Sequence, residues 1–272
     1  MIGAKVARNS IIKRSQFCEN DVEILSESSI PAFQRFFAKP YLRKSQMIEF
    51  DKNDMQSFTL LRFHIPFLMN FQGSALVIDP DIFQVKRGIE ELLDFDFNTH
   101  SLYARRGLQK NSWGSSAMLI SCDQLRHWSL DDLIDKLHYG KIDYDDLINL
   151  RLEEQSIGEL EKKWNEFDEI NQNTILLHTT EKITQPWRAG LNLNSSIPPL
   201  LKYIPRAPLY KLFGKDLTLG REHPHEGISN FFFNELAECI ASNIVSTEEL
   251  DDAIEKKYIR QDIYHKIIPF KI

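Results

Sequence analysis

Cysteine is scarce in this sequence. Cys18, Cys122 and Cys239 are the three cysteines among 272 residues, and none of them belongs to a Cys-x-x-Cys motif. An odd number of widely separated cysteines suggests neither a disulfide framework nor a thiolate zinc site. The cysteine content therefore favours a reducing compartment, and we expect a cytoplasmic protein.

Long apolar runs, internal repeats and an excess of positive charge are also lacking. No apolar run approaches the length of a membrane-spanning helix, and the net charge of −6 gives no support for general nucleic-acid binding. We find no low-complexity segment and no glycine-rich loop of the kind that holds phosphates. A nucleic-acid partner is therefore not expected, and any basic surface must be local.

The composition that remains is that of a globular protein. Hydrophobic residues make up 42% of the chain and charged residues 26%, and 272 residues suit one large domain or one domain with an appendage. Strand-like and helix-like segments alternate, which predicts an α/β fold with a mostly parallel sheet. The expected strands are residues 22–25, 75–78, 101–104, 115–121 and 174–178, and the expected helices include residues 4–14, 58–69, 88–93 and one that begins after an N-cap at Ser129.

A short apolar run, residues 75–78, ends at Asp79 and reads as a buried strand. Pro80 prevents a helix from forming across the strand end. In an extended segment residues two apart point to the same side, so Asp79 and Asp81 can converge on one hard divalent cation. The alternative is that Asp-Pro-Asp is only a turn that leaves the strand.

Residues 58–69 are apolar nearly all round and predict a buried helix beside this strand. Arg62 is the exception within them. A charged residue in such surroundings is usually paired, so a structural salt bridge and a role in gripping an anionic ligand are weighed equally.

A second informative stretch is residues 174–187, an apolar strand that ends on His178 and continues into a polar loop closed by Pro186 and Trp187. A histidine taken alone is more often a hydrogen-bonded structural residue than a ligand. However, α/β folds place ligands in a crevice at strand ends, where Asp79 and Asp81 would need a further ligand.

The C-terminal part of the chain begins with a proline-rich stretch, residues 197–213, that also carries Lys and Arg. We favour a packed connector over a basic apolar surface for a membrane or a lipid-linked acceptor, because four prolines forbid a long interfacial helix. His223-Pro-His225 is a weak metal signal. A capping box at Ser246 and Glu249, with Val245 and Leu250 as a hydrophobic staple, predicts a helix start.

In residues 4–190 the sequence resembles the retaining nucleotide-sugar glycosyltransferases that include glycogenin and the bacterial lipopolysaccharide galactosyl- and glucosyltransferases. Five motifs in the same order as in that family carry the resemblance. They are Phe58-Thr-Leu-Leu-Arg-Phe63, Leu76-Val-Ile-Asp-Pro-Asp81, Ser115-Ser-Ala-Met-Leu-Ile120, Lys163-Trp-Asn165, and the segment from His178 to Pro186-Trp187.

The resemblance implies a Rossmann-like, GT-A-type transferase with a mixed sheet flanked by helices, in residues 1–190. Residues 191–272 are then a connector and a helical C-terminal extension, packed on the same domain. It also implies a metal-dependent enzyme that transfers a hexose, with retention, from a UDP-sugar to a glycan, protein or lipid-linked acceptor. The donor sugar, the acceptor and the oligomeric state stay open.

The resemblance further assigns roles to single residues. A divalent ion held by two carboxylates and one imidazole neutralises the leaving diphosphate, and such mixed ligands suit Mn²⁺. The metal ligands would be Asp79, Asp81 and His178, and the donor contacts would be Arg62, Asp79, Gln185 and Trp187. Asp145 would lie beneath the transferred sugar, with Asp143 as a nearby alternative.

Four departures from the family pattern stand beside this resemblance. In one loop Gln185 replaces a diphosphate-binding lysine and Glu181 a glycine; Asp145 replaces a glutamine, and Gly114 replaces an asparagine. We expect the loop at Gln185 to hold the diphosphate through amides rather than charge. The family's first strand has at most residues 1–3 in its place, so the chain is expected to lack that strand. A non-catalytic relative that acts as a binding or scaffold module is the alternative function, and a nucleotidyltransferase is a distant one.

Overall fold

The computed structural model describes residues 2–50, 57–107, 112–193 and 219–270. Contacts within the chain define two compact units. The first unit comprises Met1–Val22, Pro80–Arg87 and Glu166–Ile272, and the second unit comprises Glu23–Asp79 and Gly88–Asn165. The chain therefore passes from the second unit to the first between Asp79 and Pro80, inside the motif that carries the predicted metal ligands. The predicted domain boundary at residue 190 stays a prediction.

The second unit contains a four-stranded sheet with the order β3-β6-β5-β7. Its strands are β3 (Ser74–Ile78), β5 (Leu102–Arg106), β6 (Trp113–Ser121) and β7 (Ile157–Glu159). β6 pairs antiparallel with both β3 and β5, while β5 and β7 are parallel. The last five residues of β6 are all buried, so both faces of the strand are covered there, and this explains the apolar run of residues 117–120.

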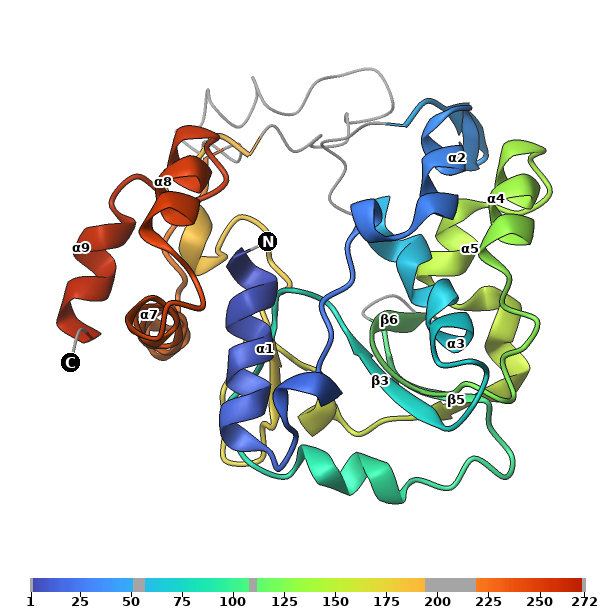
Figure 1. Cartoon of the computed structure of the whole chain (residues 1–272), viewed down its shortest axis with the longest axis horizontal. Coiled ribbons are helices and arrows are strands. Elements are labelled where there is room, and N and C mark those ends of the chain that lie inside the picture. Colours follow the sequence, from blue (N-terminus) through green and yellow to red (C-terminus); the bar gives the residue numbers. More distant parts are fainter. Residues whose placement is uncertain (1, 51–56, 108–111, 194–218, 271–272) are drawn as a thin grey trace. The chain divides into compact units, whose positions relative to one another are not determined.

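Short helices and one hairpin complete the second unit, and Figure 1 shows α2, α4 and α5 grouped together beside this sheet. The helices are α2 (Gln34–Phe37), α3 (Ile65–Leu68), α4 (Leu130–His138) and α5 (Tyr144–Ile148), and the hairpin is β1 (Tyr41–Arg43) with β2 (Gln46–Ile48). Six 3₁₀ helices are Glu27–Ser29, Pro31–Phe33, Ser57–His64, Ile89–Asp94, Arg151–Ser156 and Lys162–Trp164. The predicted N-cap is confirmed, because the Ser129 hydroxyl accepts from the Asp132 N–H.

The first unit is built on a three-stranded sheet with the order β4-β9-β8. Its strands are β4 (Ile82–Gln84), β8 (Glu166–Phe167) and β9 (Leu176–His178). β4 and β9 are antiparallel, whereas β8 and β9 are parallel. Helix α1 (Ile2–Arg14) packs on β4, where the Ser10 hydroxyl accepts from the Gln84 N–H at 2.9 Å. The predicted helix over residues 4–14 is thus confirmed.

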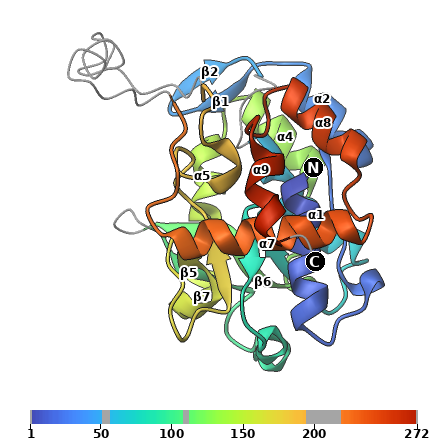
Figure 2. The same ribbon diagram turned by 90° about the vertical axis from the view of Figure 1, so that its left-hand side faces the viewer.

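Three further helices of the first unit are α7 (Glu226–Ala241), α8 (Thr247–Glu255) and α9 (Ile263–Ile267). Its 3₁₀ helices are Glu19–Asp21, Pro186–Arg188 and Ile268–Phe270. Figure 2 shows α7 running across α1, and the fully buried carboxylate of Glu235 pairs with Arg14 between them. The predicted capping box at Ser246 is present, and both staple residues are buried.

The mixed α/β character and the helical C-terminal region are confirmed, but three expectations are wrong. The sheets are mostly antiparallel, because β5–β7 and β8–β9 are the parallel pairs among the described strands. Residues 22–25 form no strand; the Val22 carbonyl accepts instead from the Arg8 side chain. Residues 58–69 form no single helix, because the 3₁₀ helix Ser57–His64 leads into the four residues of α3, which contain Pro66.

Two sequence-based expectations meet the limits of the described chain. The connector or membrane surface predicted at residues 197–213 lies outside the described residues. In the part that the structure describes, no helix combines the length and the apolar character needed to cross a bilayer.

Candidate metal and donor-binding residues

Asp79 follows directly on β3, and its backbone N–H donates to the Ser116 carbonyl of β6 at 2.9 Å. The sheet hydrogen bonding therefore extends to this residue and fixes its backbone. Asp81 follows one residue later and directly precedes β4. With a single residue between them, their Cα atoms can be at most about 7 Å apart, because each residue spans at most about 3.6 Å. The two carboxylates thus remain neighbours by chain connectivity alone.

In the second unit Asp79 is paired with Arg62. The Nη2 of Arg62 donates to Asp79 Oδ1 at 2.5 Å, and its Nη1 donates to the Ser115 hydroxyl at 2.5 Å. Arg62 is 6% exposed, and its Nε has no hydrogen-bond partner among the described residues. The salt-bridge interpretation of Arg62 is therefore confirmed. A contact between Arg62 and a donor sugar stays a prediction.

Ser115 connects this ion pair to α5. Its hydroxyl accepts from Arg62 and donates to the carbonyl of Ile148, the last residue of α5, at 2.7 Å. Arg43 lies over the Tyr144 ring, with 5.2 Å between its guanidinium carbon and the ring centroid. The Nε of Arg43 is 3.6 Å from Asp145 Oδ1. The second unit thus holds the predicted catalytic Asp145 on the helix that Ser115 links to Arg62.

The two carboxylates that the sequence left as alternatives differ in their surroundings. Asp143 accepts from the N–H groups of Asp145, Ser45 and Lys44, at 2.9, 2.7 and 3.1 Å. Burial raises the pKa of Asp143, but these hydrogen bonds outweigh it, so the pKa of this carboxyl is lowered. Asp143 therefore caps α5 and anchors the turn between β1 and β2. This leaves Asp145 as the carboxylate with an available oxygen.

In the first unit Asp81 faces His178. Ile82 of β4 pairs with His178 of β9, and the Thr179 N–H donates to the Asp81 carbonyl at 3.1 Å. This pairing brings Asp81 Oδ1 to 3.5 Å from His178 Nε2. His178 is 8% exposed and packs edge-on against Phe167. Two ligand atoms on one ion with bonds of about 2.1 Å can be up to about 4.2 Å apart, so the observed separation fits a shared ion.

Gln185 has its amide hydrogens engaged within the first unit. Its Nε2 donates to Asp81 Oδ2 at 2.9 Å and to the Thr179 carbonyl at 2.8 Å. The side chain is 2% exposed. Trp187 packs against Phe232, with ring centroids 4.8 Å apart, and against Phe83. Gln185 thus orients one metal-ligand candidate, while the donor contacts of both residues stay predictions.

Behind His178 lies a buried network that the sequence motifs did not reveal. The Asp168 N–H donates to the His178 carbonyl at 2.9 Å, and the Asp168 carboxylate accepts from the Thr180 hydroxyl. His223 Nε2 is 3.5 Å from Asp168 Oδ1, and His223 Nδ1 accepts from the His225 N–H at 3.0 Å. The weak metal signal of His223-Pro-His225 therefore corresponds to a buried histidine that lies near the Asp168 carboxylate, with no hydrogen bond between them. In the sequence, the His223-Pro-His225 pattern could have pointed to this group of residues, whereas no motif marked Asp168.

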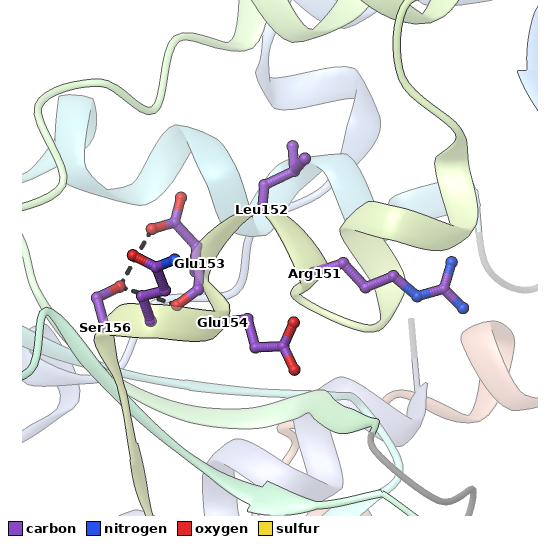
Figure 3. Close-up of a pocket in the computed structure, with 6 residues that line it drawn as sticks. Arg151, Leu152, Glu153, Glu154 and Ser156 are labelled. Carbon is purple, nitrogen blue, oxygen red and sulfur yellow. Dashed lines mark hydrogen bonds between the residues drawn. The ribbon is translucent and has the colours of Figure 1, made fainter.

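A pocket in the second unit contains none of the predicted site residues. Figure 3 shows that the 3₁₀ helix Arg151–Ser156 lines it. Glu153 accepts from the indole N–H of Trp128 at 2.8 Å and from the Ser156 hydroxyl at 3.4 Å, and it contacts His127 Nε2 at 2.7 Å. Glu153 is thus used within the fold.

Comparison with known proteins gave matches among solved structures. No model of a known protein family matches this sequence, and no curated protein matches it. The glycosyltransferase GlyE of Streptococcus pneumoniae TIGR4 is 15% identical, with a TM-score of 0.45, over 68% of this chain and 53% of GlyE. This chain therefore spans about half the length of GlyE.

Two further similar structures are also glycosyltransferases. The galactosyltransferase LgtC, solved with donor and acceptor sugar analogues, is 14% identical over 68% of this chain and 85% of LgtC, with a TM-score of 0.43. Mouse xyloside xylosyltransferase 1 is 13% identical over 65% of this chain and 91% of the mouse protein, with a TM-score of 0.42.

Proposed function

We propose that this protein is a metal-dependent, retaining glycosyltransferase of the GT-A type that transfers a hexose from a UDP-sugar to an acceptor. The observation that carries the proposal is the approach of Asp81 Oδ1 to His178 Nε2, 3.5 Å apart at the ends of adjacent strands. Asp81 ends the Leu76–Asp81 motif, and His178 begins the segment that runs to Pro186-Trp187. These are the two motifs expected to bind the metal and the diphosphate. The acceptor is a glycan, a protein or a lipid-linked sugar.

The donor set suits a divalent cation such as Mn²⁺. Asp81 and His178 offer a carboxylate and an imidazole 3.5 Å apart, and Asp79, two residues before Asp81 in the sequence, would add a second carboxylate. Carboxylate oxygens suit Mn²⁺, and imidazole is a common ligand of transition metals. When bound, the ion would act as a Lewis acid that neutralises the leaving diphosphate. Gln185 would support this role, because its hydrogen bond fixes the Asp81 carboxylate.

Residues of the second unit would bind the transferred sugar. Arg62, held by Asp79 and Ser115, would direct its guanidinium toward sugar hydroxyls. Asp145, held near Arg43, would place a carboxylate below the sugar ring. A negative charge there would stabilise the positive charge that develops on the ring as the diphosphate leaves. Buried Arg62 beside Asp79 and half-buried Arg43 beside Asp145 fit these roles.

Donor turnover tests the proposal. The purified protein is incubated with Mn²⁺ and UDP-glucose or UDP-galactose, and the release of UDP is measured with and without EDTA. The proposal predicts UDP release that EDTA abolishes. Calorimetry with UDP and Mn²⁺ separates the enzyme from a scaffold: micromolar binding supports the proposal, whereas no binding and no turnover with any donor would overturn it in favour of a non-catalytic module.

A further inference from the structure

Among the described residues, none forms a hydrogen bond or an ion pair with the guanidinium of Arg188. Arg188 ends the 3₁₀ helix Pro186–Arg188 and is half-buried, and its Nε is shielded from solvent with no hydrogen-bond partner among the described residues. A buried donor without an acceptor is unfavourable, and more so when the group is charged. An arginine in this state has donors available for an anion.

The charge of Asp81 acts on the Arg188 side chain. Burial lowers the pKa of Arg188, and the negative charge of Asp81 opposes this shift without cancelling it. An arginine guanidinium nevertheless stays protonated at neutral pH. The first unit thus places a cation within the electrostatic field of a proposed metal ligand.

Gln185 cannot provide the donors that the sequence assigned to it. A primary amide carries two hydrogens, and those of Gln185 are directed to Asp81 Oδ2 and to the Thr179 carbonyl. The remaining amide oxygen is an acceptor, which repels a phosphate oxygen. Arg188 is three residues further along the same loop, and its backbone N–H donates to the Gln185 carbonyl at 2.9 Å.

The backbone that carries Arg188 is firmly held. Residue 220 packs directly on it: a Cβ at Gly220 would lie 2.0 Å from the Arg188 carbonyl oxygen, so a glycine is required there. Arg260 holds the two residues before Arg188. Its backbone N–H donates to the Trp187 carbonyl at 2.9 Å, and its side-chain Nη1 donates to the Pro186 carbonyl at 3.2 Å. The backbone from which the Arg188 side chain extends is therefore fixed before a ligand binds.

We infer that Arg188 is the cation that binds the diphosphate of the donor, next to the metal ion held by Asp81 and His178. This inference rests on the proposed function. It assigns to a guanidinium the charge that the loop lacks at Gln185. A guanidinium can donate two parallel hydrogen bonds to phosphate oxygens, which a lysine cannot. The ligand chemistry is therefore a pyrophosphate group, whichever nucleoside or sugar it carries.

The competing explanation is that Arg188 only compensates the charge of Asp81. The two explanations differ in the binding of inorganic pyrophosphate at saturating Mn²⁺, measured by calorimetry on the whole chain. We expect Arg188→Gln to weaken pyrophosphate binding at least about tenfold, which corresponds to the loss of one charge-assisted hydrogen bond. Arg188→Lys keeps the charge but cannot donate two parallel hydrogen bonds. Its pyrophosphate affinity should lie between those of the wild type and Arg188→Gln. The affinity for Mn²⁺ alone should not fall in either variant.

Arg87→Gln is the matched control, because it removes the same charge from an exposed position of the first unit. It should bind pyrophosphate like the wild type. Wild-type affinity in Arg188→Gln, or in Arg188→Lys where the glutamine variant does not fold, would overturn the inference and leave the proposed function standing. If the wild type itself binds neither UDP nor pyrophosphate with Mn²⁺, both the proposed function and this inference are overturned.

Discussion

Asp79 Oδ1 accepts a hydrogen bond from Arg62 Nη2 at 2.5 Å, and both side chains are largely buried. Arg62 thus neutralises a carboxylate at the strand end where the sequence predicts a metal. A protein without its metal can keep a buried carboxylate ionised in this way, because an arginine compensates the charge. The pair sets the first testable prediction.

Removal of Arg62 should destabilise the protein and expose this compensation. Arg62→Met leaves the Asp79 carboxylate without its partner, and breaking a buried pair on one side costs about 3–5 kcal/mol. Urea unfolding measures the change. Lys256→Met is the control, because Lys256 pairs with Asp252 at an exposed position, where such pairs contribute at most about 1 kcal/mol. Equal effects of both substitutions would contradict a buried, structurally important pair.

Substitution of Asp143 should affect stability, whereas substitution of Asp145 should affect turnover. Asp143→Ala removes an N-cap and the acceptor of two hairpin N–H groups, so we expect a loss of about 1–2 kcal/mol in the free energy of unfolding. Asp145→Asn should leave stability within about 0.5 kcal/mol and lower kcat at least about a hundredfold. Thermal melts and UDP release measure the two quantities. If Asp143→Ala abolishes turnover while Asp145→Asn does not, the assignment of the two carboxylates is reversed.

Sequence patterns predicted the elements whose signals are local. The apolar runs of β3 and β6, the Ser129 cap of α4 and the Ser246 capping box depend on neighbouring residues, and the structure contains them. Strand direction depends instead on contacts between distant segments, which is why a mostly parallel sheet was the wrong expectation. Alternating strands and helices indicate the composition of an α/β fold, but they do not fix which strands become neighbours.

The site was predictable as residue types but not as hydrogen bonds. The choice between Asp143 and Asp145 depends on Lys44 and Ser45, about a hundred positions away, whose N–H groups occupy Asp143. In the same way, the amide of Gln185 is occupied by Asp81, which no motif indicates. A pattern can show that a side chain has donors. Only the folded chain shows whether other groups already use them.

Acid should weaken the support of the Pro186–Trp187 loop through Glu222. Hydrogen bonds from Arg260 are the main reason that the pKa of Glu222 is lowered to about 2. Because the folded-state pKa lies below the unfolded one, near 4.5, this stabilisation is present above about pH 4.5 and is lost as the pH falls toward 2. Glu222→Gln should therefore reduce the slope of unfolding free energy against pH between 2 and 4.5. The same slope in Glu222→Gln and wild type would contradict the assignment, and Glu255→Gln, at an exposed position of α8, serves as the control.

The central claim is the metal site, and Asp81 tests it most directly because it is the proposed ligand that faces His178. Asp81→Asn keeps the shape and removes the charge, so the fold should persist while the metal site is lost. The measurement is the thermal melting of wild type and Asp81→Asn, each with and without Mn²⁺ and UDP, with the exposed Asp94→Asn as the control. Ligand at about 100 times its Kd stabilises the folded state by about 2.7 kcal/mol. We predict a ligand-induced rise in Tm for wild type and Asp94→Asn, and none for Asp81→Asn; an equal rise in all three proteins would contradict the metal site.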